Sequence, residues 1–207
     1  DTRNEFTIAL SGTGTSGMEA SLINILEPGD TVIVAVNGLF GQRIADIANR
    51  CGANVTTVEA EWGYPVDISK VGEAFDAAGR VKLLAAVHVE TSTGVVQPMI
   101  PFAELAHARG ALFLADAVTS LGGVDLHVDD WGIDTCYSAT QKCVGSPPGM
   151  SPITLSPRAV EVLRSRETPV QSFYLDLQLL EKYWLTDHVY HHTASMSMIY
   201  GLREALI

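Results

Sequence analysis

Lys142 is the residue of this sequence best placed for covalent chemistry. It lies in the segment 138–145 (SATQKCVG), among small and polar residues, after an expected strand and before a turn rich in glycine and proline. A lysine in a desolvated pocket can lose its proton and attack a carbonyl carbon, forming a Schiff base. The other lysines, Lys70, Lys82 and Lys182, have the contexts of surface charges. A loop lysine in a salt bridge has the same local pattern, so Lys142 alone indicates no reaction.

A carboxylate and a glycine-rich segment also suit chemistry. Asp116 directly follows the apolar run 111–115, so we expect its carboxylate at a strand end, although a helix cap or turn residue has the same pattern. The segment 11–17 (SGTGTSG) opens a helical pattern. Its glycines admit a ligand, its hydroxyls can donate, and a helix N-terminus offers unpaired N–H groups to an anion. An ordinary turn, with Ser16 and Glu19 as a capping box, explains this segment equally well.

These three features together match what pyridoxal phosphate requires of a protein. The glycine-rich segment would hold the phosphate, and Asp116 would keep the pyridine nitrogen protonated, so that the ring accepts the electron pair of a broken Cα bond. Lys142 would bind the cofactor aldehyde and, once released, move the Cα proton. Each feature is weak alone, but their order and their positions after strands favour this cofactor.

The elements that must position these residues follow an alternating pattern. Expected strands cover residues 6–10, 31–36, 54–58, 82–89, 111–115 and 135–138. Expected helices cover residues 16–26, 39–50, 67–78, 101–108, 157–166, 175–183 and 195 to the end. Alternation of this kind predicts an α/β fold, with a mostly parallel central sheet and helices on both faces. Such a sheet binds ligands beyond the carboxyl ends of its strands.

Composition excludes several other classes of protein. The 207 residues carry a formal charge of −11 and are 47% apolar, which argues against a nucleic-acid binder and against disorder. The apolar runs are too short to span a bilayer, so no membrane partner is expected. Three cysteines without a C-x-x-C pair suit a reducing compartment, and we expect a cytoplasmic protein. The chain starts at Asp1 and stops inside a helical pattern, as expected for a piece of a longer protein.

The sequence resembles the class V aminotransferases of fold type I, and within them the alanine–glyoxylate and serine–pyruvate group. The matching segments span the whole chain: 11–19, 37–43 (NGLFGQR), 88–94 (HVETSTG), 115–117 with 120–123, 141–142 and 190–193 (YHHT). The resemblance implies that residues 1–207 form the large cofactor-binding domain, without an N-terminal arm and a C-terminal small domain. That small domain carries the arginine that holds the substrate carboxylate, and none of the nine arginines here matches it.

The resemblance also assigns a role to each matching position. Lys142 is the implied Schiff-base lysine and Asp116 the implied partner of the pyridine nitrogen. Thr91 matches a hydroxyl residue near the phenolic oxygen, and Phe40 takes the place of an aromatic, usually Trp in the animal enzymes, that stacks on the ring. The implied phosphate contacts are Thr13, Gly14, Thr15 and Gln141. From the helical pattern alone, Phe40 would be read as a core aromatic.

The segment 190–193 is expected at a subunit interface. Tyr190 and Thr193 match residues that the family sends to the phosphate of a neighbouring subunit, which implies a homodimer. His191 and His192 are of a residue type that binds metals, but adjacent histidines point in different directions and no Cys or carboxylate completes a zinc set, so we expect no metal. His88 is expected to be a satisfied core histidine close to the cofactor.

The resemblance therefore implies transfer of an amino group from alanine or serine to glyoxylate or pyruvate by a ping-pong mechanism. Ureidoglycine–glyoxylate and 2-aminoethylphosphonate–pyruvate aminotransferases remain alternatives, because Thr91 and the segment 141–149 are partly similar to the ureidoglycine enzymes. A desulfurase or lyase on the same scaffold is less favoured, since neither Cys136 nor Cys143 lies in an expected mobile loop. A domain that binds the cofactor without turnover is the alternative outside enzymes.

Overall fold

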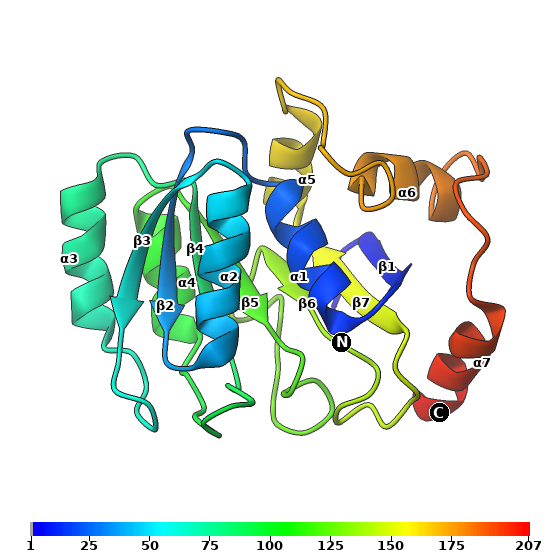
Figure 1. Cartoon of the computed structure of the whole chain (residues 1–207), viewed down its shortest axis with the longest axis horizontal. Coiled ribbons are helices and arrows are strands. Elements are labelled where there is room, and N and C mark those ends of the chain that lie inside the picture. The colour runs from blue at the N-terminus through cyan, green and yellow to red at the C-terminus, as the bar shows by residue number, and fades with distance from the viewer. Residues whose placement is uncertain (1) are drawn as a thin grey trace.

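The computed structural model describes residues 2–207, which form one seven-stranded sheet flanked by helices (Figure 1). The strands are β1 (Phe6–Ser11), β2 (Thr31–Val36), β3 (Asn54–Glu59), β4 (Leu83–Val87), β5 (Leu112–Asp116), β6 (Thr135–Tyr137) and β7 (Met150–Leu155). Their order is β1-β7-β6-β5-β4-β2-β3, and β7 alone runs against the other six. The predicted mostly parallel sheet is confirmed.

Helices cover both faces of the sheet, as expected. They are α1 (Gly14–Ile23), α2 (Leu39–Arg50), α3 (Ile68–Ala78), α4 (Ile100–Ala108), α5 (Pro157–Arg164), α6 (Leu177–Trp184) and α7 (Met196–Ala205). One apolar core lies between the sheet and α1, α2, α5 and α6, and a second lies between the sheet, α3 and α4. Figure 1 shows α1 and α2 in front of the sheet and α4 behind it.

Strand β2 shows why the parallel strands are apolar on both sides. Its residues alternate between the two cores: Val32, Val34 and Val36 belong to the first, and Ile33 and Ala35 to the second. Because both faces are covered, a central strand has no polar side. Continuous apolar runs therefore predicted these strands correctly, to within a few residues at each end.

Strand β7 is the element that the sequence pattern does not predict. It lies between β1 and β6, although Pro152 stands in its middle, opposite Ala9. Proline cannot donate to a ladder, so its presence argues against a central strand. Here the Pro152 carbonyl still accepts a hydrogen bond from the Ser138 amide (2.8 Å), and the strand remains paired on both sides.

The start of α1 also differs from expectation. The capping box predicted for Ser16 and Glu19 is wrong, because the helix already begins at Gly14 and its N-cap is Thr13, whose side chain caps no amide. Ser16 lies in the first turn and donates its hydroxyl to the Thr13 carbonyl (2.6 Å). No residue replaces the missing cap, which leaves the first amides of α1 available for another acceptor.

The chain ends in α6, which adds Leu177 and Leu180 to the first core, and in α7, which lies apart from α6 at the C-terminus (Figure 1). Several large apolar side chains in this part are exposed, among them Phe173, Tyr190 and Tyr200. Within the described residues, no helix is long and apolar enough to cross a membrane.

Substitution by alanine should change the stability of the protein in opposite directions at two helical glycines, Gly17 of α1 and Gly72 of α3. A Cβ at Gly17 would overlap the Ser151 side chain, whereas a Cβ at Gly72 of α3 would meet nothing within 4 Å. We expect Gly17→Ala to lower the free energy of unfolding by about 1–3 kcal/mol through overpacking. We expect Gly72→Ala to raise it by up to about 1 kcal/mol through helix propensity. Denaturant unfolding measures both, and a Gly17→Ala protein as stable as the wild type would contradict this packing.

Candidate active site

The candidate residues gather where the parallel strands end. Thr13 and its neighbours follow β1, Phe40 follows β2, Thr91 follows β4, and Lys142 follows β6, while Asp116 is the last residue of β5. Side-chain contacts join several of these loops. The hydroxyls of Thr91 and Thr119 are in hydrogen-bond contact, and the Cys143 thiol, next to Lys142, donates to the Thr119 carbonyl (3.2 Å). The structure thus places the loops after β4, β5 and β6 side by side.

Asp116 is a buried carboxyl group held by two donors. Only 2% of the residue is exposed. Its Oδ1 accepts from the Val118 amide (2.8 Å) and its Oδ2 from the Tyr137 hydroxyl (2.6 Å). Burial raises the pKa of Asp116 from 3.8 to about 6, although both hydrogen bonds lower it, and the charge of Glu90 raises it further. A carboxyl group in this position favours a cationic partner.

Lys142 is half-buried, and no other described residue forms a hydrogen bond or an ion pair with its side chain. The salt-bridge alternative for this residue is therefore not what the structure shows within residues 2–207. Lys82 does form such a pair, with Nζ 2.7 Å from Oδ2 of Asp30. Gln141, the other candidate on this loop, is exposed.

The glycine-rich segment has the features of an anion cradle. Neither the amide of Gly14 nor that of Thr15 donates to a described residue, and both lie in the first turn of α1. A Cβ at Gly14 would lie 2.8 Å from Cβ of Ala139, so glycine lets this turn approach the loop after β6. Free amides at a helix N-terminus, with the exposed hydroxyls of Thr13 and Thr15, suit a phosphate group. Together with Asp116 and Lys142, they fit pyridoxal phosphate.

Phe40 is half-buried at the start of α2 and packs against the first core. The guanidinium carbon of Arg43 lies 4.9 Å from the centre of its ring, in the range of a cation–π contact. Phe40 thus has a polar neighbour as well as core contacts, and the reading of it as a purely internal aromatic does not describe its position.

Two residues near the site were not singled out from the sequence. Tyr137 supplies the hydroxyl that donates to Asp116, and a tyrosine in a buried strand needs such a partner, which is a signal the sequence does contain. Glu90 is fully buried and accepts from the first amides of α2. It lies in the segment 88–94 that supported the resemblance, where only His88 and Thr91 were assigned roles.

Tyr190 and Thr193 lie in the exposed segment between α6 and α7, and their hydroxyls contact each other (3.2 Å). No hydrogen bond joins either one to another candidate residue within the described part of the chain. Their neighbour His192 does reach the base of the cradle, with Nε2 2.9 Å from Oγ of Ser11. The pair His191 and His192 contact each other through their Nδ1 atoms (2.9 Å). Residues 2–207 contain no cluster of three or more potential metal ligands.

His88 is buried as expected, but it is not satisfied. Its Nδ1 has no hydrogen-bond partner among the described residues, and its ring meets the edge of Trp131 with the centroids 5.3 Å apart. Burial lowers the pKa of His88, so the neutral form is favoured.

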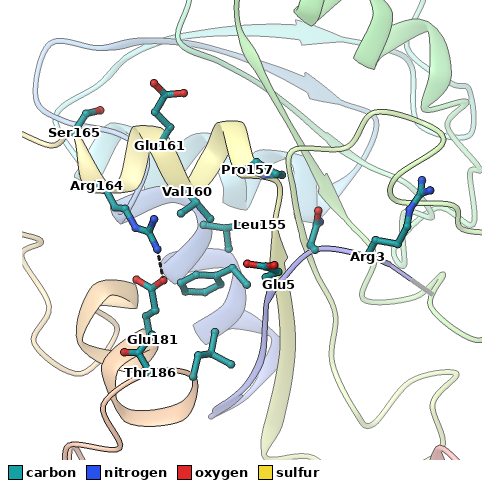
Figure 2. A pocket seen from close by; sticks show the side chains of 13 residues that line it. Arg3, Glu5, Leu155, Pro157, Val160, Glu161, Arg164, Ser165, Glu181 and Thr186 are labelled. Atoms are coloured by element: carbon teal, nitrogen blue, oxygen red, sulfur yellow. Dashed lines mark hydrogen bonds and ion pairs between the residues drawn. The ribbon is translucent and has the colours of Figure 1, made fainter.

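A hollow of about 920 Å³ lies away from these residues (Figure 2). Its walls include Phe6 at the start of β1, Leu155 at the end of β7, and residues of α5 and α6 such as Arg164 and Glu181. It therefore lies at the amino end of β1, opposite the cradle, and no candidate residue lines it. The site is defined by its chemistry and not by this hollow.

The family model for aminotransferase class-V matches residues 2–207, and the fold agrees with that of solved aminotransferase structures. The chain belongs to this family, and the resemblance stated from the sequence is confirmed.

Its relatives include several proteins named for transfer to glyoxylate. The alanine–glyoxylate aminotransferase of Callithrix jacchus is 44% identical over an alignment of 208 positions, which covers 99% of this chain and 50% of that protein. The solved structure of the alanine–glyoxylate aminotransferase from Nostoc sp. is 49% identical, with a TM-score of 0.96 over 99% of this chain and 54% of the other. The ureidoglycine–glyoxylate aminotransferase structure from Bacillus subtilis is 40% identical, with a TM-score of 0.96 over 99% and 53%. The chain spans about half the length of these relatives.

The buried carboxyl group of Asp116 should make the cofactor-free protein less stable at neutral pH than at acidic pH. Its pKa is raised from 3.8 to about 6, so between these values the folded state holds more protons than the unfolded state. Stability must therefore fall as the pH rises through this window, by up to about 3 kcal/mol at about 1.4 kcal/mol per pKa unit. Asp116→Asn should remove this fall, because an amide does not ionise.

Denaturant unfolding of the cofactor-free protein between about pH 4 and about pH 7 measures this effect. The wild type is the control, and we expect Asp116→Asn to gain stability relative to it as the pH rises. If both proteins have the same pH dependence, the carboxyl group of Asp116 does not ionise in the folded state as inferred here.

Proposed function

We propose that the protein is a pyridoxal-phosphate-dependent aminotransferase that moves an amino group from alanine or serine to glyoxylate or pyruvate by a ping-pong mechanism. The observation that carries the proposal is the buried Asp116 beside a loop whose lysine, Lys142, has no ion-pair partner among the described residues. Similarity over 99% of the chain to proteins named alanine–glyoxylate aminotransferase supports the substrates. Among the two acceptors, glyoxylate appears in the names of these relatives.

The residues of the site divide the work of holding the cofactor. The amides of Gly14 and Thr15 and the hydroxyls of Thr13 and Thr15 bind the phosphate, with Gln141 beside them. Phe40 stacks on the ring, and Thr91 lies near the phenolic oxygen. When bound, pyridoxal phosphate supplies an aldehyde that exchanges amines and a ring that accepts the electron pair released at Cα.

Two groups of the chain handle protons. The Asp116 carboxylate, ionised by a cationic partner, holds a proton on the pyridine nitrogen, and the Tyr137 hydroxyl keeps its Oδ2 in place (2.6 Å). The Lys142 amine would hold the cofactor through its aldehyde and, once freed by the amino donor, would serve as the base that takes the proton from the donor Cα. Its freedom from other partners leaves it able to move between these roles.

The desulfurase alternative lacks a suitable thiol. Cys136 is buried in β6, and burial raises its pKa to about 12, which disfavours the reactive thiolate. Cys143 is exposed, but its thiol donates to the Thr119 carbonyl. A sulfur-accepting thiolate has to reach the substrate, and neither cysteine is arranged for that.

Lys142 should be the residue that the cofactor modifies. Borohydride reduction of the full-length protein, followed by peptide mapping, should place the reduced cofactor on Lys142. Lys142→Ala should lower kcat by about 10³-fold or more, the range that a positioned proton-transfer group contributes. Lys70→Ala, at an exposed lysine of α3, is the matched control and should leave kcat unchanged. An adduct on any lysine other than Lys142 would refute the assignment.

The donor is tested by spectral titration of the full-length protein with alanine, serine, ureidoglycine and 2-aminoethylphosphonate. We expect alanine or serine to convert the cofactor band and glyoxylate to restore it. Conversion by ureidoglycine alone would favour the ureidoglycine–glyoxylate reaction, to which the Bacillus subtilis relative owes its name. A band that no donor changes would favour a domain that binds without turnover.

A homodimer is part of this proposal, with Tyr190 and Thr193 acting on the partner's phosphate. Tyr190 is 72% exposed, as a residue that acts outside its own subunit would be in a single chain. Co-expression of Lys142→Ala with Tyr190→Ala then yields mixed dimers in which one site carries both lesions and the other carries neither. Random mixing should restore roughly a quarter of wild-type activity in a twofold dimer. Activity no higher than that of the two single variants would place Tyr190 in its own subunit's site.

A further inference from the structure

The N-terminus of α2 is capped by a loop that lies 49–53 residues further along the sequence. Its N-cap is Gly38, which has no side chain to accept a hydrogen bond. The first three amides of the helix donate instead to the loop after β4. Leu39 donates to Oγ of Ser92 (2.9 Å), and Phe40 and Gly41 donate to Oε2 of Glu90 (3.1 and 3.2 Å).

Glu90 is the central residue of this cap. It is completely buried, and its second carboxylate oxygen, Oε1, accepts from the amide and the hydroxyl of Ser92 (3.0 and 2.7 Å). Both oxygens are therefore occupied by donors, and the positive end of the α2 dipole faces the carboxylate. A buried carboxylate is stable only with such partners. Among the described residues, no basic side chain bonds to Glu90, so the α2 N-terminus is the nearest source of positive charge for it.

The backbone at Gly38 is shaped for this contact. A Cβ at that position would overlap Cγ of Glu90 and lie 2.5 Å from Oγ of Ser92. The φ angle of Gly38 is 170°, an extended value open to any residue, so the demand for glycine here comes from the approach of the loop and not from the backbone angle. A fourth hydrogen bond, from the Thr93 hydroxyl to the Asn37 carbonyl (3.2 Å), joins the same two segments.

The two loops that Glu90 joins carry two of the candidate cofactor contacts. Phe40 offers its own amide to Glu90, and Thr91 is the next residue along the chain. Glu90 thus fixes the expected ring-stacking side chain relative to the expected phenolic-oxygen contact. The charge of Glu90 also affects Asp116, because it adds a smaller increase to the pKa that burial has the largest part in raising.

We infer that Glu90 is a positioning residue, which holds Phe40 and Thr91 in the arrangement that a bound cofactor ring needs. This inference rests on the proposed function, because the ring that Phe40 stacks on is that of pyridoxal phosphate. The action of Glu90 is indirect, because both oxygens of its buried side chain already accept hydrogen bonds from the two loops.

A cap that only stabilises a helix would behave differently, and α3 offers the comparison. Asp67 caps α3 by accepting from the Ser69 amide (2.9 Å), and it is exposed and belongs to no candidate group. Removing either cap should lower the melting temperature of the cofactor-free protein. Only the loss of the Glu90 cap should also change how the cofactor is held.

The experiment compares Glu90→Ala, Glu90→Gln and the control Asp67→Ala in the full-length protein. It measures the affinity for added pyridoxal phosphate, the circular dichroism of the bound cofactor in the visible, and the melting temperature without cofactor. We expect Glu90→Ala to weaken cofactor affinity at least tenfold and to diminish the dichroic band, whereas Asp67→Ala lowers only the melting temperature. Glu90→Gln keeps an oxygen for the α2 amides, so it should retain most of the band and lie between Glu90→Ala and the wild type in affinity.

Unchanged affinity and an unchanged band in Glu90→Ala would overturn the inference, as would losses in Asp67→Ala equal to those in the Glu90 variants. If Glu90→Ala does not fold, Glu90→Gln decides: wild-type affinity together with a wild-type band would overturn the inference, and a measurable loss in either would support it. Failure of the proposed function is a separate result, because it would appear in the wild type itself: no binding of pyridoxal phosphate, or binding without any amino transfer.

Discussion

A carboxyl group without access to water is the constraint on which the rest of this site depends. Asp116 ends a strand whose five residues are all buried, and the two donors it has, the Val118 amide and the Tyr137 hydroxyl, do not offset the loss of water, so its pKa stays high. Such a group is poorly satisfied by the protein alone, and it becomes ionised when a cation is placed against it. The buried Asp116 carboxyl group therefore lowers the stability of the cofactor-free protein, and a protonated ring nitrogen bound against it would restore that stability. This opposition between stability and ligand binding is typical of functional sites.

The sequence predicted the fold where each element depends on its own residues. Strands such as β2 and β5 are apolar on both faces, so a run of buried residues was enough to find them. Strand β7 was missed because its pairing with β1 and β6 overrides the local effect of Pro152. The Ser16 capping box failed for the opposite reason: the local pattern was present, but the helix starts earlier and leaves its amides free.

The same distinction, between residues recognisable from their own sequence context and residues that depend on distant partners, applies to the candidate site. Lys142, Asp116 and the segment 11–17 could be found because each lies at, or a few residues after, the end of a strand, and the strand-end rule needs no knowledge of contacts. Glu90 and Tyr137 could not be assigned roles in this way, because their partners lie 50 and 21 residues away. Residues that touch a ligand carry a recognisable chemistry, whereas residues that hold them are defined by what the fold brings next to them. The contacts of Tyr190 and Thr193 with a second subunit lie outside what one chain can display.

The negative net charge of the chain opposes the binding of a phosphate at the segment 11–17. A phosphate must enter a protein of formal charge −11, and the segment 11–17 contains no lysine or arginine. At physiological salt, charges beyond about 8 Å are largely screened, so the excess of distant acidic residues matters less than the nearest dipoles. Those dipoles are the free amides at the start of α1, which carry the positive end of the helix. The loss of a side-chain cap at Thr13 is thus what keeps the amides available, and a well-capped α1 would be a more stable helix with a poorer anion site.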